Sequence, residues 1–176
     1  MSHPFEDMLT GGHPNSLGRT EEVVAQVLEN PDRIEALYAC YGSADAVVRL
    51  RTSSAFKRVA AVRPDLVMGL MDRLLDEIGM LDQASAQWTL AQLFQRLSDR
   101  MTPAQRGRAL AILKRNLAGH DDWIVLNTTI DTLTGWAKDD PGLARWLHPH
   151  LDRLRHDSRK SVAGRAAKAI RRLADG

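Results

Sequence analysis

An apolar pattern of 13 residues recurs four times along this chain, and the recurrence constrains the fold more than any other feature. The copies begin 38, 39 and 37 residues apart. Near-constant spacing of this size is typical of repeat proteins, in which each unit buries its apolar face by stacking on its neighbours. The copies are VRLRTSSAFKRVA at 48–60, AQWTLAQLFQRLS at 86–98, VLNTTIDTLTGWA at 125–137 and VAGRAAKAIRRLA at 162–174.

Each copy has the periodicity of a helix, and no segment shows the alternation that is typical of a strand. Apolar residues recur three and four positions apart, as they do on one face of a helix. The apolar volume comes mostly from Leu, Ala and Val, with aromatic residues at only 5%, and this composition also favours helices. The expected fold class is therefore all-α.

Turn and capping residues divide the chain into nine predicted helices. Pro31 and Pro64 occupy first-turn positions, and Thr102 and Gln105 have the spacing of a capping box. Pro149 lies inside a predicted helix and is expected to kink or split it. The predicted helices are 20–29, 31–41, 44–62, 64–79, 82–98, 103–118, 121–138, 141–156 and 158–174.

The first and last copies resemble the HEAT-repeat (armadillo-like α-solenoid) family. Repeats of that family place an aspartate in the turn between paired helices, followed by Val-Arg, small residues and an aliphatic residue. Residues 48–60 carry the Val-Arg pair and the small residues, and residues 157–174 carry the turn aspartate, Asp157. The two middle copies lack the Val-Arg pair.

The resemblance covers residues 31–174 and implies about four helix pairs stacked into a solenoid. The helix at 20–29 would cap the N-terminal end of a repeat domain that spans residues 20–176. Residues 1–19, rich in Gly, Pro, Ser and His, would form an extended arm.

Three small side chains are expected to serve packing rather than chemistry. A solenoid helix packs on its partner and on both neighbouring repeats, so Thr52 and Ala55 would let backbones approach closely. Cys40, the single cysteine, excludes an intrachain disulfide and a multi-cysteine metal site. No histidine stands at motif spacing from Cys40, so we expect a partly buried structural residue.

The resemblance also implies a binding face, because the second helix of each HEAT pair lines the concave surface. Helical spacing places one strip of residues opposite the apolar stripe, and in the third copy it includes Asn127, Asp131 and Thr134. Trp88 stands out there as a candidate anchor, unless the strip is misplaced by one residue or the arm covers it. The predicted binding residues are Leu50, Lys57, Arg58, Trp88, Gln92, Gln95, Arg96, Asn127, Asp131, Lys168, Arg171 and Arg172.

Charge is spread unevenly along the chain although the net charge is only +2. Residues 1–98 carry 9 basic and 13 acidic side chains, whereas residues 145–176 carry 9 basic and 3 acidic ones. The plainer interpretation of the basic end is a solvated terminal face, and the alternative is an anion-binding patch.

No arrangement of residues predicts catalysis, a metal or a cofactor. His148, Asp152 and His156 have i, i+4, i+8 spacing, but Pro149 disturbs the helix that would present them, so no metal site is expected. The glycine-rich segment 11–20 lacks the lysine and the spacing of a phosphate-binding loop. It is better explained as a flexible arm that folds back on the first repeats.

The chain shows no sign of membrane association. The first 20 residues lack the basic and apolar segments of a signal peptide. No apolar run approaches the roughly 18 residues that span a membrane. With a single cysteine, these features predict a cytoplasmic protein without a membrane partner.

The sequence therefore predicts a non-enzymatic scaffold that presents a concave surface to a macromolecule, with a protein favoured as the partner. The alternative is a DNA-binding HEAT-like protein related to the alkylpurine DNA glycosylase branch, for which no catalytic residue can be assigned here. An enzyme on a helical-repeat scaffold would rest on fold analogy alone. In the DNA-binding alternative the phosphate contacts would be Lys57, Arg58, Arg96, Lys168, Arg171 and Arg172.

Overall fold

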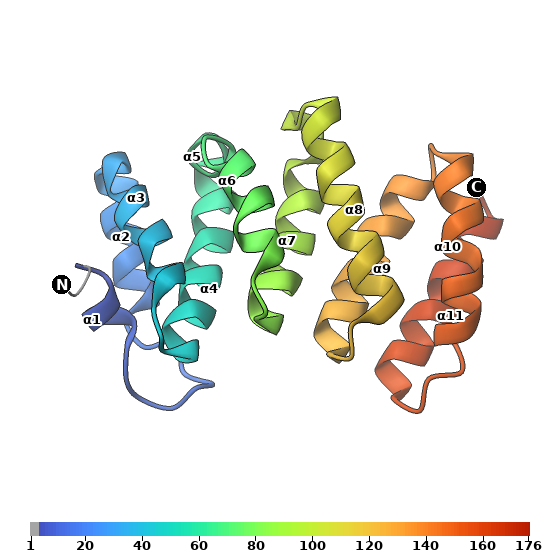
Figure 1. Ribbon diagram of the computed structural model, residues 1–176, viewed down its shortest axis with the longest axis horizontal. Coiled ribbons are helices and arrows are strands. Elements are labelled where there is room, and N and C mark those ends of the chain that lie inside the picture. The colour runs from blue at the N-terminus through green and yellow to red at the C-terminus, as the bar shows by residue number, and fades with distance from the viewer. Residues whose placement is uncertain (1–3) are drawn as a thin grey trace. The chain divides into compact units, whose positions relative to one another are not determined.

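The computed structural model describes residues 4–176, and every regular element in that range is a helix (Figure 1). The prediction of an all-α protein is confirmed. The α-helices are α1 (Glu6–Leu9), α2 (Thr20–Glu29), α3 (Ile34–Ala39), α4 (Ala46–Val62), α5 (Pro64–Met68), α6 (Met71–Asp76), α7 (Ala84–Leu97), α8 (Pro103–Gly119), α9 (Trp123–Ala137), α10 (Pro141–Leu154) and α11 (Lys160–Ala174). Four short 3-10 turns are η1 (Pro31–Arg33), η2 (Cys40–Gly42), η3 (Ile78–Met80) and η4 (Ser98–Arg100).

Seven of the nine predicted helices occur within about two residues of their predicted ends. The Thr102 capping box is present, with the Thr102 hydroxyl and the Gln105 side chain each accepting the other residue's backbone N–H. The two remaining predictions, 31–41 and 64–79, are wrong in part, because shorter helices and 3-10 turns replace each single helix. In the second of these segments the break falls at Gly69, a poor helix former.

Pro149 does not split its helix, contrary to one of the two outcomes expected from the sequence. α10 runs continuously from Pro141 to Leu154 with Pro149 inside it. Proline removes one backbone donor from the helix. The apolar stripe that continues on both sides of Pro149 is fully or almost fully buried, and this packing holds the helix together: Leu143, Leu147, Leu151 and Leu154.

The chain forms two compact units, Met1–Thr89 and Leu90–Gly176. In the first unit α4 packs against α1, α2 and α5. Thr52 and Ala55 are 0% exposed in α4, so their predicted role in packing is confirmed. The Thr52 hydroxyl donates to the Val48 carbonyl one turn earlier, which satisfies the polar group inside the core.

The predicted N-terminal arm is folded where the structure describes it, and residues 1–3 lie outside the described range. Residues 6–9 form α1, which packs on α4 and α2, and Phe5 and Leu9 are fully buried. Arg51 of α4 is also fully buried, and its guanidinium donates to four backbone carbonyls of this segment. The acceptors are Leu9 O (2.8 Å), Gly11 O (2.6 Å), His13 O (3.1 Å) and Ser16 O (3.1 Å).

A glycine with a left-handed backbone closes this segment over Arg51. Gly18 has φ +54°, a conformation that glycine adopts far more readily than other residues. A Cβ atom at Gly18 would lie 2.9 Å from Nη1 of Arg51. The close approach of backbone to guanidinium therefore depends on the missing side chain.

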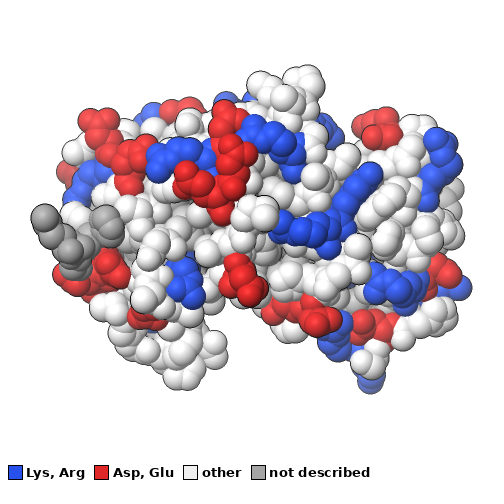
Figure 2. Space-filling model, viewed as in Figure 1, with Lys and Arg blue, Asp and Glu red and all other residues white. Residues whose placement is uncertain are grey.

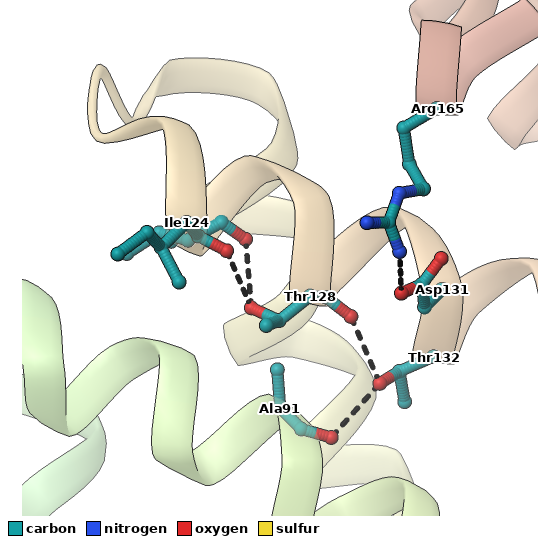
Figure 3. A network of polar contacts seen from close by, with 7 residues as sticks. Ala91, Ile124, Thr128, Asp131, Thr132 and Arg165 are labelled. Carbon is teal, nitrogen blue, oxygen red and sulfur yellow. Dashed lines mark hydrogen bonds and ion pairs between the residues drawn. The ribbon is translucent and has the colours of Figure 1, made fainter. Parts of the chain in front are cut away.

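In the second unit α9 is the central helix, since it packs against α8, α10 and α11. α11 packs against both α9 and α10. The hydroxyls of two threonines in α9 donate hydrogen bonds to backbone carbonyls (Figure 3). Thr128 donates to Ile124 O at 2.8 Å, and Thr132 donates to Thr128 O at 3.1 Å and to Ala91 O of α7 at 2.8 Å.

Candidate functional site

Most predicted binding residues of the first unit are less open to solvent than the sequence suggests. Lys57 is exposed, but Leu50, Arg58 and Trp88 are half-buried. The Arg58 guanidinium also lies 3.5 Å from the Glu21 carboxylate, which weakens its availability as a phosphate contact. Trp88 was expected to be exposed, and the structure shows that it is half-buried instead.

In the second unit the predicted strip is partly exposed and partly core. Gln95 and Arg96 are exposed and Gln92 is half-buried. Asn127 is only 5% exposed, so its prediction as a solvent-facing binding residue is wrong. The reason is that α9 packs against three other helices and has more than one buried face.

Asp131 of α9 and Lys168 and Arg172 of α11, all predicted binding residues, come together in one small pocket of about 30 Å³. The pocket lies between α9 and α11, and Ala169 forms part of its wall. Thr134, on the predicted strip, and Arg165, which the prediction missed, complete the lining. Residues 165, 168 and 172 are spaced three and four apart, so one face of α11 presents all three cations.

The Thr134 hydroxyl is buried without a hydrogen-bond partner among residues 4–176. A helical threonine commonly donates to a carbonyl one turn earlier, as Thr128 and Thr132 of the same helix do. The Thr129 hydroxyl is unpartnered as well, but of the two only Thr134 lies in the wall of this pocket. An unpartnered buried hydroxyl is unfavourable, so a polar group in the pocket would relieve a cost.

The pocket carries an excess of positive charge. Arg165 forms an ion pair with Asp131 across the α9–α11 interface (Figure 3). Lys168 and Arg172 are exposed and form no ion pair with any residue of the described chain. Three cations and one carboxylate leave two positive charges in the lining of the pocket. This combination of a donor and cations suits an anion.

An apolar groove of about 520 Å³ lies between α10 and α11. Two cationic or titratable residues, Arg145 and His148, stand among its apolar lining residues, which are Ala144, Pro149, Ile170, Leu173 and Ala174. Ile170 and Leu173 are half-buried. Their equivalents in the second copy of the repeat, Phe94 and Leu97, are almost completely buried. The last copy of the pattern therefore leaves its apolar positions partly open.

A third hollow, of about 230 Å³, links the groove to the cationic pocket through shared lining residues. It shares Ala144 and Leu173 with the groove and Arg172 with the pocket. One surface around the C-terminal end of α11 thus combines apolar and cationic residues.

A separate hollow of about 400 Å³ lies between α8, α9 and α10. The Arg106 guanidinium lies 4.4 Å from the centre of the Trp136 ring in its wall, a cation–π contact. Trp136 is half-buried, and its indole nitrogen lacks a hydrogen-bond partner within residues 4–176. Asp139 and Asp140 also line this hollow, and they disfavour an anion there.

The remaining candidate groups offer little chemistry. Burial raises the pKa of the Cys40 thiol to about 11, so the thiolate is scarce at neutral pH and Cys40 is not activated as a nucleophile. Within residues 4–176, no three His, Cys, Asp or Glu side chains are grouped so that they could hold a metal ion. In the same range no helix has the length and apolar character needed to cross a membrane.

The chain was compared with protein-family models and with curated proteins. No family model matches the chain. A search of curated proteins finds no significant match either.

Proposed function

We propose that this chain is a non-enzymatic, HEAT-like α-solenoid that binds a protein partner through its C-terminal helices. The observation that carries the proposal is the apolar groove between α10 and α11. The four-fold repeat at 38-, 39- and 37-residue spacing supports the solenoid, because stacked helix pairs bury a repeated apolar pattern.

The groove favours a partner segment that is both apolar and acidic. Ile170 and Leu173 offer partly open apolar surface that a partner's aliphatic side chains would cover. Arg145 in the groove wall and the exposed Arg171 and Arg172 of α11 would pair with carboxylates on the partner. An amphipathic segment with acidic flanks meets both demands.

A protein suits this surface better than a nucleic acid does. Duplex DNA is held mainly through its phosphates, and it would leave the apolar groove without a contact. Figure 2 shows acidic side chains among the basic ones on the face in view, including the region of the C-terminal helices. Carboxylates among the cations repel a phosphate backbone, whereas an acidic protein segment can align its charges around them. The alternative function, DNA binding, is supported by the exposed cations Lys168, Arg171 and Arg172.

The experiment is selection of binding peptides from a displayed random library, followed by affinity measurements on the purified peptides. We expect enriched peptides to be acidic and to carry aliphatic residues three or four positions apart. Leu173→Glu should abolish their binding, because it places a carboxylate in the groove. Val62→Glu is the matched control, since Val62 is 62% exposed in the first unit and lies outside the groove.

Two results would contradict the proposal. The first is a selection that enriches no peptide, or only basic ones. The second is peptide binding that Leu173→Glu leaves unchanged although Leu173→Glu is folded by circular dichroism.

A further inference from the structure

We propose that the pocket between α9 and α11 binds the phosphoryl group of a phosphorylated side chain in the partner protein. This inference rests on the proposed function, because it names the chemical group that the partner presents. Three features of one pocket carry it: a buried hydroxyl without a hydrogen-bond partner in residues 4–176, two cations without an ion pair in that range, and a small volume.

The Thr134 hydroxyl gives the pocket a hydrogen-bond donor that could serve a polar acceptor. Thr134 is 0% exposed, and its hydroxyl has no acceptor within residues 4–176. Its neighbour Thr132 shows that α9 can satisfy a threonine from its own backbone. Thr134 lines the cationic pocket, and a rotation of its side chain toward the pocket would let this hydroxyl donate to an anionic oxygen.

The charges match a phosphate monoester. Asp131 neutralises Arg165 through their ion pair, which leaves the charges of Lys168 and Arg172 without a partner in the described chain. A phosphorylated side chain carries about −1.5 to −2 charges at neutral pH, because its second pKa is about 6. The two unpartnered charges therefore suit one phosphoryl group.

The size favours a monoester on a side chain over the diester of a nucleic acid. The pocket is small, about 30 Å³, and therefore suits a single oxyanion better than an aromatic base. A monoester has three free oxygens for the donors of Thr134, Lys168 and Arg172, whereas a diester has two. A nucleic acid would also need a row of such contacts to bind tightly.

The nearby groove adds a reason to assign the phosphate to a peptide. Arg172 lines the pocket, Leu173 lines the groove, and both residues line the third hollow, so the two sites adjoin on α11. We therefore expect an aliphatic side chain within a few residues of the phosphorylated one.

The first measurement is titration of the ¹⁵N-labelled full chain with inorganic phosphate, with chloride at matched ionic strength as the reference. Backbone signals of residues around Thr134, Lys168 and Arg172 should shift with phosphate and remain in place with chloride. The same titration with phosphoserine blocked at both ends should shift the same signals. Dimethyl phosphate, a diester, should bind less tightly.

Three variants test the assignment. Thr134→Val and Arg172→Gln should each weaken the binding of blocked phosphoserine about tenfold or more, since each removes a donor to a charged oxygen. Lys160→Gln is the matched control, because Lys160 is an exposed cation at the start of the same helix and does not line the pocket. It should leave the affinity within about twofold, as expected for a distant surface charge.

The outcomes separate this inference from the proposed function. If phosphate and phosphoserine shift nothing beyond chloride, or if Thr134→Val and Arg172→Gln bind as the wild type does, the pocket is a hydration site and the inference is wrong. Acidic peptides would still bind the groove in that case, so the proposed function would survive. Preference for dimethyl phosphate over phosphoserine would overturn the assignment to a side chain and favour a nucleic acid.

Discussion

Thr134→Val should stabilise the unliganded protein even though it removes a donor from the proposed phosphate pocket. Thr134 is 0% exposed, and its hydroxyl has no hydrogen-bond partner among residues 4–176. A buried polar group without a partner costs about 1–3 kcal/mol. Valine keeps the branched shape and has nearly the same helix propensity, so the substitution removes that cost and little else.

The expected gain in the free energy of unfolding is about 1 kcal/mol, the lower end of the range for an unpartnered hydroxyl. In a chain of 176 residues this corresponds to a rise of about 2–4 °C in Tm. The measurement is urea and thermal unfolding followed by far-UV circular dichroism. The buffer must be free of phosphate, because a bound anion would stabilise the wild type and mask the difference.

Thr132→Val is the matched control on the same helix. Thr132 is also 0% exposed, but its hydroxyl donates to Ala91 O and Thr128 O (Figure 3). The same chemical change should therefore lower the free energy of unfolding by about 1 kcal/mol, the usual worth of a hydrogen bond. The two substitutions are predicted to have opposite signs.

Destabilisation by Thr134→Val equal to that by Thr132→Val would refute the reasoning. It would mean that the Thr134 hydroxyl already has a partner, such as an ordered water. The pocket would then have no free donor to offer a phosphate.

Three further predictions concern other parts of the chain. Arg51→Met should lower the free energy of unfolding by about 3 kcal/mol or more and expose residues 9–18 to limited proteolysis, because it leaves one buried and three partly buried carbonyls without their donor. Unchanged protease resistance would contradict this. Duplex DNA should bind weakly, with affinity that depends on residues 145–176 and falls steeply with salt in fluorescence anisotropy; nanomolar affinity at physiological salt, or base excision from alkylated DNA, would favour the alternative function. Hydrogen bonds from the Arg159 side chain and backbone lower the pKa of Asp157 to about 2. Its contribution to stability is therefore present above about pH 4 and lost as the pH falls toward 2. Asp157→Asn should flatten that part of a urea-midpoint profile, and an unchanged profile would argue against the contact.

Helix ends and the main apolar faces could be predicted from sequence because local interactions determine them. The capping box at Thr102 and Gln105 needs only residues three apart, and it is present as expected. Thr52 and Ala55 fall on the buried face of α4 because the 3.6-residue period alone places them beside Phe56. The prediction of a single helix over 64–79 was wrong at Gly69 and in the short helices around it. In such a segment helix propensity is weak, and a 3-10 turn differs little from an α-helical turn in stability.

Only the tertiary structure decides which polar residues are buried and which charges meet. The period of α9 cannot reveal that other helices cover Asn127 and Thr134 on a second side. Arg51 is buried because a segment about 35 to 42 residues earlier supplies its acceptors, and no local pattern encodes that pairing. The sequence places Asp131 and Lys168 on the exposed strips of their helices, but their common pocket, and the pairing of Asp131 with Arg165, arise when α9 packs against α11. The sequence period reports which side of one helix is apolar, whereas this pocket forms only where two helices pack against each other.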